Sequence, residues 1–280
     1  MPGAELPVLL PPAPPARAQG DARFGLKARH GLYIAVLFAL ATGAAQAASD
    51  AGLPGPFETL LKWVPFVLKG FGLNLVISFF AMLFGTIAGA ALGLMQISLL
   101  APVRSGSWLV TQFFRNSPWL VLLFAIMLLF PFELDFGFVV VPVPDWMKAV
   151  IGFSLPIMAN ISEVVRGAVQ SLPSGQWESA ESLAFTRGQT LRMVILPQCI
   201  KRMIPPWINW YCILAMATPL ASIMGVEESV TYTAQTLNAE GDRPELIWPF
   251  YLFLLLIFFA YTYPIARWSI RLERKFLVKT

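Results

Sequence analysis

Charged residues are scarce in this chain. Only 13% of its 280 residues are Asp, Glu, Lys or Arg, whereas 57% are apolar. A soluble domain carries about a quarter charged residues. Too little polar surface remains to cover a globule in water, so the composition argues against a soluble domain and indicates a protein whose solvent is lipid.

The chain also has few of the residues that build catalytic or metal sites. It contains one histidine, His30, and two cysteines, Cys199 and Cys212, which do not form a disulfide framework. No Gly-x-x-x-x-Gly-Lys-Ser/Thr segment is present to hold nucleotide phosphates. We therefore expect no metal site, no cofactor and no ATP site in this chain, and no enzymatic activity of its own.

The net charge of +4 could suggest nucleic-acid binding. No basic patch interleaves with aromatic residues, however, as a nucleic-acid surface requires. In a membrane protein a basic excess marks the cytoplasmic loops, and that is the interpretation favoured here.

The N-terminal region divides into two parts. Residues 1–30 are rich in Pro and Ala and are predicted to be disordered. Residues 31–48 carry no charge and are either a retained transmembrane segment or a secretory signal, because Ala45-Gln46-Ala47 resembles a cleavage site. A retained segment is favoured.

Five further apolar runs predict five core transmembrane helices, since a span needs about 20 residues. The expected spans are 70–103, 116–132, 149–167, 203–226 and 246–266. Gly85, Gly89 and Gly93, spaced four residues apart, predict close packing against a neighbouring helix. The predicted fold class is an all-α polytopic membrane protein, with the N-terminal hydrophobic segment followed by a transmembrane domain over 60–280.

The distribution of charge predicts the orientation. If the loops 133–148 and 227–245 lie outside together with Glu58, the outer side holds four of the 20 basic residues and ten of the 16 acidic ones. The inner side then holds 16 basic and six acidic residues, as the positive-inside rule requires.

The loop 170–197 falls on the cytoplasmic side in this topology. Ser174 is expected to cap a first short helix, and Thr186-x-x-Gln189 fits a capping box that opens a second. Leu196-Pro197 is expected to end that second helix. Two short helices joined at a corner would form a rigid projection, able to transmit force to a soluble partner.

This loop resembles the EAA loop of type I ABC importer permeases, with Glu178-Ser179-Ala180 in the Glu-Ala-Ala position and Ile195-Leu196-Pro197 at its close. Further segments are similar, in the same order, to the polar amino acid uptake branch: Phe-Arg-Asn-Ser-Pro at 114–118, Glu-Val-Val-Arg-Gly at 163–167, Ser-Leu-Pro-Ser-Gly-Gln-Trp-Glu at 171–178, Arg-Met-Val-Ile-Leu-Pro-Gln at 192–198 and Pro-Leu-Ala-Ser-Ile-Met-Gly at 219–225. The resemblance covers residue 60 to the C-terminus.

The sequence departs from the family pattern at three places. Ala184 replaces the loop glycine and Ser179 replaces an alanine. Both residues are small, so close approach of a partner is expected to survive, but a bend that depends on glycine is not. Residues 216–219 replace a more polar Lys-Asp-Thr-Ser segment, so a sister subunit is expected to carry more of the substrate contacts.

The resemblance implies a type I ABC importer-like fold and a permease subunit that moves polar amino acids across the bacterial inner membrane as a multi-pass protein. It implies as partners two cytoplasmic ABC ATPase subunits that bind ATP, a periplasmic amino-acid-binding protein, membrane lipid and a second permease subunit. A heterodimer is favoured over a homodimer. The residues implied in ATPase coupling are Glu178, Ser179, Ala180, Ala184, Arg187 and Gly188. The alternative for Glu178 is an exposed acid that only stabilises a helix N-terminus.

Five residues are candidates for the substrate pathway: Asn160, Glu163, Thr218, Ser222 and Arg115. A charge at mid-membrane costs about 2.5–3.5 kcal/mol, so Glu163 should lie near the cytoplasmic end or pair with Arg166. It is either part of an inner gate or a packing salt bridge, and the salt bridge is favoured. Arg115 either extends to lipid headgroups or contacts the gate or a neighbouring subunit. Thr218 and Ser222, beside Pro219, either line the pathway or satisfy the kinked backbone.

Two other functions compete with the importer. An ion-coupled secondary transporter acting without an ATPase would need intramembrane ionisable relays and usually internal repeats, but the sequence offers one marginal acid and no repeat. A scaffold without a pathway predicts that Asn160, Glu163 and Thr218 face lipid or pack dry.

Overall fold

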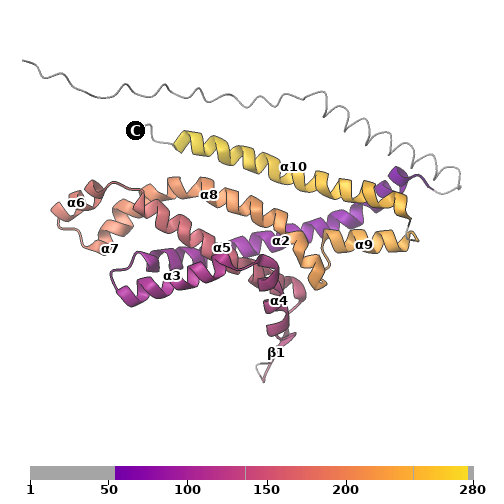
Figure 1. Ribbon diagram of the computed structural model, residues 1–280, viewed down its shortest axis with the longest axis horizontal. Coiled ribbons are helices and arrows are strands. Elements are labelled where there is room, and N and C mark those ends of the chain that lie inside the picture. Colours follow the sequence, from indigo (N-terminus) through magenta and orange to yellow (C-terminus); the bar gives the residue numbers. More distant parts are fainter. Residues whose placement is uncertain (1–53, 136, 242, 277–280) are drawn as a thin grey trace, which may run out of the picture.

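The structure is a computed structural model that describes residues 54–135, 137–241 and 243–276. The predictions for residues 1–30 and 31–48 lie outside these ranges. Within them the chain is almost entirely helical, and its longest helices run side by side as an elongated bundle (Figure 1). The predicted all-α polytopic membrane fold is confirmed.

Four helical stretches in the described part of the chain are long and apolar enough to cross a membrane. They are α2 (Pro56–Gln96), α5 (Asp145–Gln170), the continuous stretch Arg187–Met224, and α10 (Pro244–Phe276). As predicted, α5 continues past Glu163. The stretch Arg187–Met224 consists of α7 (Arg187–Gln189), the π-helical η1 (Thr190–Ile195), α8 (Leu196–Ala217) and the 3-10 helix η2 (Thr218–Met224).

The predicted span over 116–132 is wrong in its bounds. Helix α3 (Ala101–Asn116) ends before it, and α4 (Trp119–Leu129) turns away from α3 by 103°. Ser117 precedes Pro118 and has a ψ of 136°, the extended conformation that a residue before proline prefers. With 11 residues, α4 is only about 16 Å long. The fifth crossing therefore exists only if α3 and α4 are counted as one bent span.

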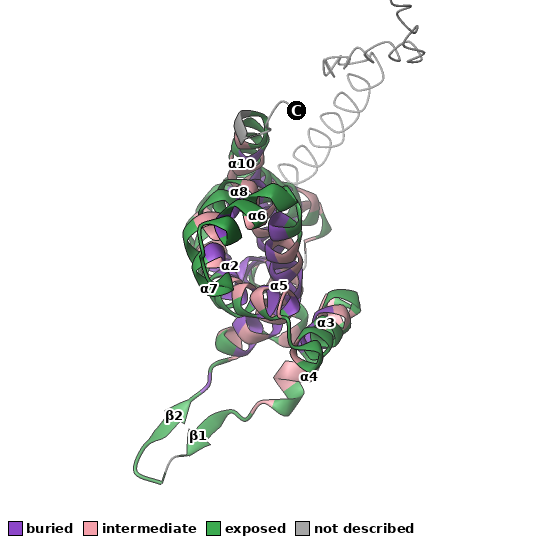
Figure 2. Ribbon diagram, turned by 90° about the vertical axis from the view of Figure 1, so that its left-hand side faces the viewer, coloured by how far each residue is buried: buried purple, intermediate pink, exposed green. Residues whose placement is uncertain are grey.

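A short antiparallel hairpin, which was not predicted from the sequence, follows α4. Strand β1 (Glu133–Asp135) pairs with β2 (Val140–Pro142), with Leu134 opposite Val141. Helix α4 and this hairpin, residues 119–135 and 137–143, leave the bundle sideways and are called the arm below (Figures 1 and 2).

The centre of the bundle is the contact between α2 and α5, where the buried faces of both helices meet (Figure 2). A Cβ atom on Gly89 would lie 2.6 Å from the carbonyl oxygen of Met158, and one on Gly93 would lie 2.7 Å from that of Ser162. These glycines therefore let two backbones touch. The prediction of close helix packing is confirmed.

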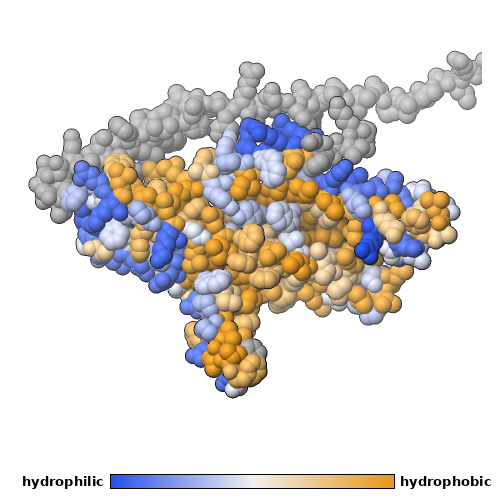
Figure 3. Space-filling model, turned by 180° about the vertical axis from the view of Figure 1, so that it is seen from behind, coloured by the Kyte–Doolittle hydropathy of each residue, from blue (hydrophilic) through white to orange (hydrophobic). Residues whose placement is uncertain are grey.

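The surface changes from apolar to polar along the bundle. Apolar side chains cover its middle and polar ones gather toward its two ends (Figure 3). Helix α6 (Ser174–Ser182) and α7 lie at one end, and α9 (Ser229–Ala239) lies near the other (Figure 1). The charge distribution makes the α6 end cytoplasmic.

Candidate functional site

The cytoplasmic end of the bundle carries a sharp turn after α6. The amide of Ala184 donates to the carbonyl of Glu181 at 2.8 Å, and that of Phe185 donates to the carbonyl of Ala180 at 3.1 Å. This pair of bonds is a Schellman motif, which places one residue in the left-handed conformation and usually uses glycine there. Ala184 occupies that position with φ of 59°. The expectation that the bend needs glycine is therefore wrong, because alanine adopts the same conformation at some cost.

The helix after this turn begins as predicted but does not end as predicted. Thr186 and Gln189 form the capping box. The helix then runs on through Leu196 and Pro197, because the π-helical η1 shifts the hydrogen-bond register and Pro197 falls in the first turn of α8, where proline is tolerated. The predicted cap at Ser174 is also wrong: Pro173 is the N-cap and Ser174 is the first helical residue.

Side-chain contacts fasten this loop to two of the long helices, α2 and α8. The Arg187 guanidinium donates to the carbonyl of Ile97 at the end of α2, at 3.2 Å, and lies over the Trp177 ring. Arg202 on α8 donates to both the carbonyl and the hydroxyl oxygen of Ser171, each at 2.9 Å.

Beneath the loop is a small apolar core of five buried residues: Ala168, Val169, Leu172, Ile195 and Cys199. The loop is thus packed on its own transmembrane helices as well as bonded to them. A displacement of the loop must move α2, α5 and α8 as well.

The six predicted coupling residues do not all face outward. Glu178, Ser179, Ala184 and Gly188 are exposed. Arg187 is exposed but bonds inward, to α2. Ala180 is only 4% exposed and faces the protein interior, so it is available to shape the helix but not to touch a partner.

A first polar cluster lies where α2, α3 and α5 meet. The amide nitrogen of Gln96 donates to the hydroxyls of Thr111 at 2.9 Å and Ser162 at 3.1 Å, and these hydroxyls lie 2.9 Å apart. Within the described residues the Gln96 carbonyl oxygen is buried without a hydrogen-bond partner. A buried acceptor left unpaired is costly, so this cluster is polar and incompletely satisfied.

Two arginines flank Glu163 near this cluster. Arg166 donates two hydrogen bonds to it, at 2.5 and 3.3 Å, and a nitrogen of Arg115 on α3 lies 3.6 Å from the same carboxylate. The predicted pairing with Arg166 is confirmed. Arg115 also pairs with Glu163, so of the alternatives for Arg115 the structure shows a contact with the candidate gate residue of its own chain. Asn160 is buried and donates to the carbonyl of Pro156 on its own helix.

A second polar cluster lies around the start of η2, and of its four members only Thr218 was predicted as a site residue. Asn74 on α2 donates to the Thr218 hydroxyl at 3.1 Å and to the Glu228 carboxylate at 2.8 Å, and accepts from the Ser229 amide at 3.1 Å. Asn74 is a polar amide within the apolar run 70–103, and that placement was the signal available in the sequence. Ser222 donates to the carbonyl of Pro219.

Glu228 is fully buried and caps α9. Its carboxylate accepts hydrogen bonds from the amides of Val230 and Thr231 at 2.9 and 3.1 Å, and from the Ser229 hydroxyl at 3.1 Å. Burial raises its pKa, and these bonds together with the one from Asn74 oppose that rise. Thr218 and Asn160 are buried too, so neither lines an open passage in this conformation.

Comparison with known proteins identifies the family. Residues 81–275 match the family described as binding-protein-dependent transport system inner membrane component. The chain belongs to this family. It is therefore a multi-pass inner-membrane permease subunit of an ABC importer, which works with ATPase and substrate-binding partners, and the family does not support a secondary transporter.

Among curated relatives, the probable amino-acid ABC transporter permease protein YckA of Bacillus subtilis is 36% identical over 76% of this chain and 89% of its own length. The glutamate/glutamine/aspartate/asparagine transport system permease protein BztC of Rhodobacter capsulatus is 32% identical over 88% of this chain and 55% of its own length. Both align with most of this permease.

Solved structures agree with the fold. A chain described as an amino acid ABC transporter with histidines matches with a TM-score of 0.66 and 23% identity, over 77% of this permease and 96% of that chain. The MetNI methionine ABC transporter matches with a TM-score of 0.55 and 16% identity, over 78% of this permease and 98% of that chain.

Proposed function

We propose that this permease subunit carries polar amino acids across the inner membrane, driven by ATP that two separate cytoplasmic ATPase subunits bind and hydrolyse. The names of YckA and BztC support the substrate class. A periplasmic amino-acid-binding protein delivers the substrate to the outer face, and a second permease subunit, different from this one, completes the passage. The chain needs no cofactor of its own.

One observation carries this proposal: the loop 170–197 is exposed on its outer face and fastened on its inner face to the long helices. Glu178 and Ser179 are available to a soluble partner. Arg187 connects the loop to the end of α2, and Arg202 on α8 holds Ser171 at the start of the loop. A force applied by an ATPase at α6 therefore reaches the membrane helices through short, specific contacts.

The ion pairs of Glu163, next to the first polar cluster, support an inner gate at the cytoplasmic side of the passage. Glu163 is paired with arginines from two helices, Arg115 on α3 and Arg166 on α5. Relative movement of α3 and α5 would break the longer of these contacts first. In this proposal Asn160, Thr218 and Ser222 become accessible to substrate only when the helices have moved.

The test is uptake by the complete transporter in proteoliposomes, with its ATPase and binding protein and with labelled amino acids. Glu178→Arg places a positive charge on the exposed face of α6, and we expect loss of both uptake and ATPase co-purification. Glu273→Arg, the same charge reversal at an exposed position of α10, is the matched control and should transport normally.

Uptake at the normal rate by the Glu178→Arg transporter would refute the coupling role of the loop. Amino-acid transport by the purified permease without any ATPase would refute the ATP-driven mechanism itself.

A further inference from the structure

A cavity of about 410 Å³ lies between the loop 170–197 and the corner where α2 passes into α3. Its volume is in the range of pockets that hold small metabolites. Glu178 and Ser179, the residues of α6 proposed to face the ATPase, do not line it. The lining includes two arginines, a serine, a glutamine and a tryptophan: Arg104, Arg187, Ser174, Gln96 and Trp177.

The two arginines give this cavity a surplus of hydrogen-bond donors. Arg104 donates to the carbonyl of Ser98, and Arg187 donates to the carbonyl of Ile97, each at 3.2 Å. A guanidinium has five N–H donors, and both side chains are exposed, so a ligand can reach the remaining donors from the solvent. No Asp or Glu of the described ranges lines the cavity. Both positive charges are therefore available to an anion.

The start of α6 adds to this preference for an anion. Ser174, the first residue of this nine-residue helix, lines the cavity, and Pro173 at the N-cap position provides no side-chain hydrogen bond. The first amides of a helix carry partial positive charge and bind carboxylate or phosphate oxygens. An anion in the cavity would meet two guanidinium groups and these amides together.

Gln96 supplies a buried acceptor to the same cavity. The residue is 4% exposed. Its amide nitrogen is occupied by the hydroxyls of Thr111 and Ser162, and its carbonyl oxygen has no hydrogen-bond partner among the residues that the structure describes. A carboxylate brings no donor for this oxygen. A ligand that satisfies both the arginines and Gln96 must carry a donor beside its negative group, as the ammonium of an α-amino acid does.

We propose that this cavity is a cytoplasmic amino-acid site, in which Arg104, Arg187 and the start of α6 bind the α-carboxylate and Gln96 accepts a hydrogen bond from the α-ammonium. These groups contact the part that all α-amino acids share, so the site takes small polar amino acids without selecting among their side chains. The five candidate pathway residues do not line the cavity, so the site is separate from the passage. A bound amino acid would link the α2–α3 corner to α6, where Arg187 already connects the loop to α2.

Thiol protection in the complete transporter, held in lipid nanodiscs, tests the site. The two native cysteines are buried, so Ser174→Cys places a reactive thiol in the cavity. Ser182→Cys is the matched control, exposed at the other end of α6. Maleimide labelling of each position is followed by mass spectrometry of the permease peptide. L-glutamine at about four times its Kd should slow labelling at Ser174→Cys about fivefold and leave labelling at Ser182→Cys unchanged.

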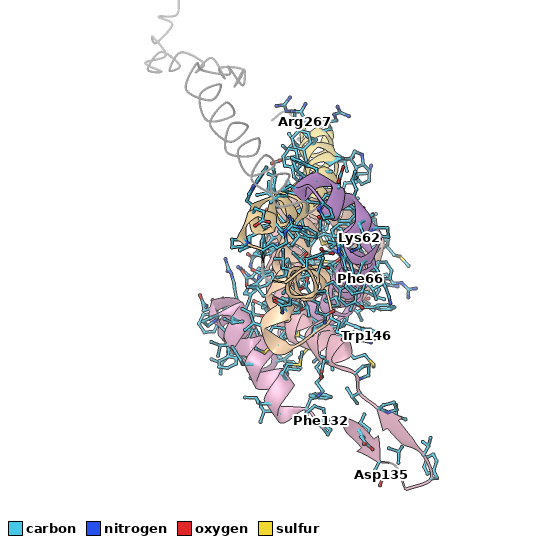
Figure 4. The ribbon with its side chains drawn as sticks, turned by 90° about the vertical axis from the view of Figure 1, so that its right-hand side faces the viewer. Lys62, Phe66, Phe132, Asp135, Trp146 and Arg267 are labelled. Carbon is cyan, nitrogen blue, oxygen red and sulfur yellow. The ribbon has the colours of Figure 1, made fainter. Side chains whose placement is uncertain are left out.

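Analogues and a second substitution test the chemistry. N-acetyl-L-glutamine lacks the ammonium and L-glutaminamide lacks the carboxylate, so each should protect Ser174→Cys about tenfold less well than L-glutamine. Adding Arg104→Gln should raise the Kd of L-glutamine about tenfold. Adding Arg267→Gln should leave it unchanged, because Arg267 is an exposed arginine of α10, which Figure 4 shows projecting from the edge of the bundle.

Equal slowing at Ser174→Cys and Ser182→Cys, or no slowing at Ser174→Cys, would overturn the inference. Protection by inorganic phosphate or by anionic lipid as strong as that by L-glutamine would also overturn it, in favour of a simple anion site. If Ser174→Cys does not assemble, Ser98→Cys, which also lines the cavity, gives the same measurement. Because labelling needs no transport, absent protection beside normal uptake would refute this site and leave the proposed function standing.

Discussion

Ala184 is held in a backbone conformation that costs an alanine about 1–2 kcal/mol. The conformation persists because both hydrogen bonds of the Schellman motif and the capping box at Thr186 surround it. The sequence showed that the glycine was missing, but it could not show that neighbouring bonds would impose the glycine geometry on alanine.

We expect Ala184→Gly to stabilise the loop by about 0.5–1 kcal/mol, because the removed strain exceeds the greater unfolded-state entropy of glycine. The measurement is hydrogen exchange of the loop amides, which should slow. Ala180→Gly makes the same change inside α6, where the backbone is right-handed, and should speed exchange. Faster exchange in Ala184→Gly would show that the residue is unstrained.

Glu228 and Glu227 are adjacent acids with opposite environments, one fully buried and one exposed. Glu228→Ala removes the acceptor for Asn74, Ser229 and two α9 amides, so we expect a loss of about 2 kcal/mol in the free energy of unfolding. Thermal unfolding in detergent measures it, and Glu227→Ala should change stability little. Equal effects of the two substitutions would contradict the role of the cluster.

The raised pKa of Glu228 determines the direction in which this residue makes the stability of the protein change with pH. The folded protein takes up this proton at a higher pH than the unfolded chain, whose carboxyl titrates near 4.5. The wild type should therefore gain stability relative to Glu228→Gln as the pH falls toward 4.5, and should lose that gain as the pH rises through the folded-state pKa.

At the scale of elements, the sequence predicted the helices well where apolar runs and glycine spacing determined them. It failed where two local signals competed. The run 116–132 is uncharged throughout, but Ser117-Pro118 breaks it. Pro197 signalled a helix end, but the π-helical turn before it accommodates the proline and lets the helix continue. Burial of Ala180 depends on how α6 packs on distant helices, which periodicity in a nine-residue helix does not reveal.

The packing of α2 against α5 provides the prediction at this scale. Gly89→Ala would place a Cβ atom 2.6 Å from a backbone oxygen of α5, so the helices must separate, and we expect a loss of about 1–3 kcal/mol in the free energy of unfolding. Gly72→Ala lies on the same helix with nothing within 4 Å of its Cβ position. It should be neutral or stabilising by about 0.5–1 kcal/mol in thermal unfolding. A neutral Gly89→Ala would show that the two helices are not in fixed contact.

For the whole molecule, the sequence predicted an apolar middle between two polar ends, which Figure 3 shows, while the inside-out orientation remains a prediction from the charge distribution. The sequence could not predict the arm, because the direction in which α4 leaves the bundle follows from one bend and from packing at its root. Nor could it reveal Asn74 and Glu228 as neighbours, since 154 residues separate them along the chain.

The helical stretch Arg187–Met224 is continuous and connects the cytoplasmic loop with the second polar cluster. Its part from Arg187 in the cytoplasmic loop to Thr218 in the second polar cluster extends over roughly 47 Å at the helical rise of 1.5 Å per residue. Because one helical backbone joins the two sites, a displacement of the loop at Arg187 would be transmitted directly to the hydrogen bonds around Thr218.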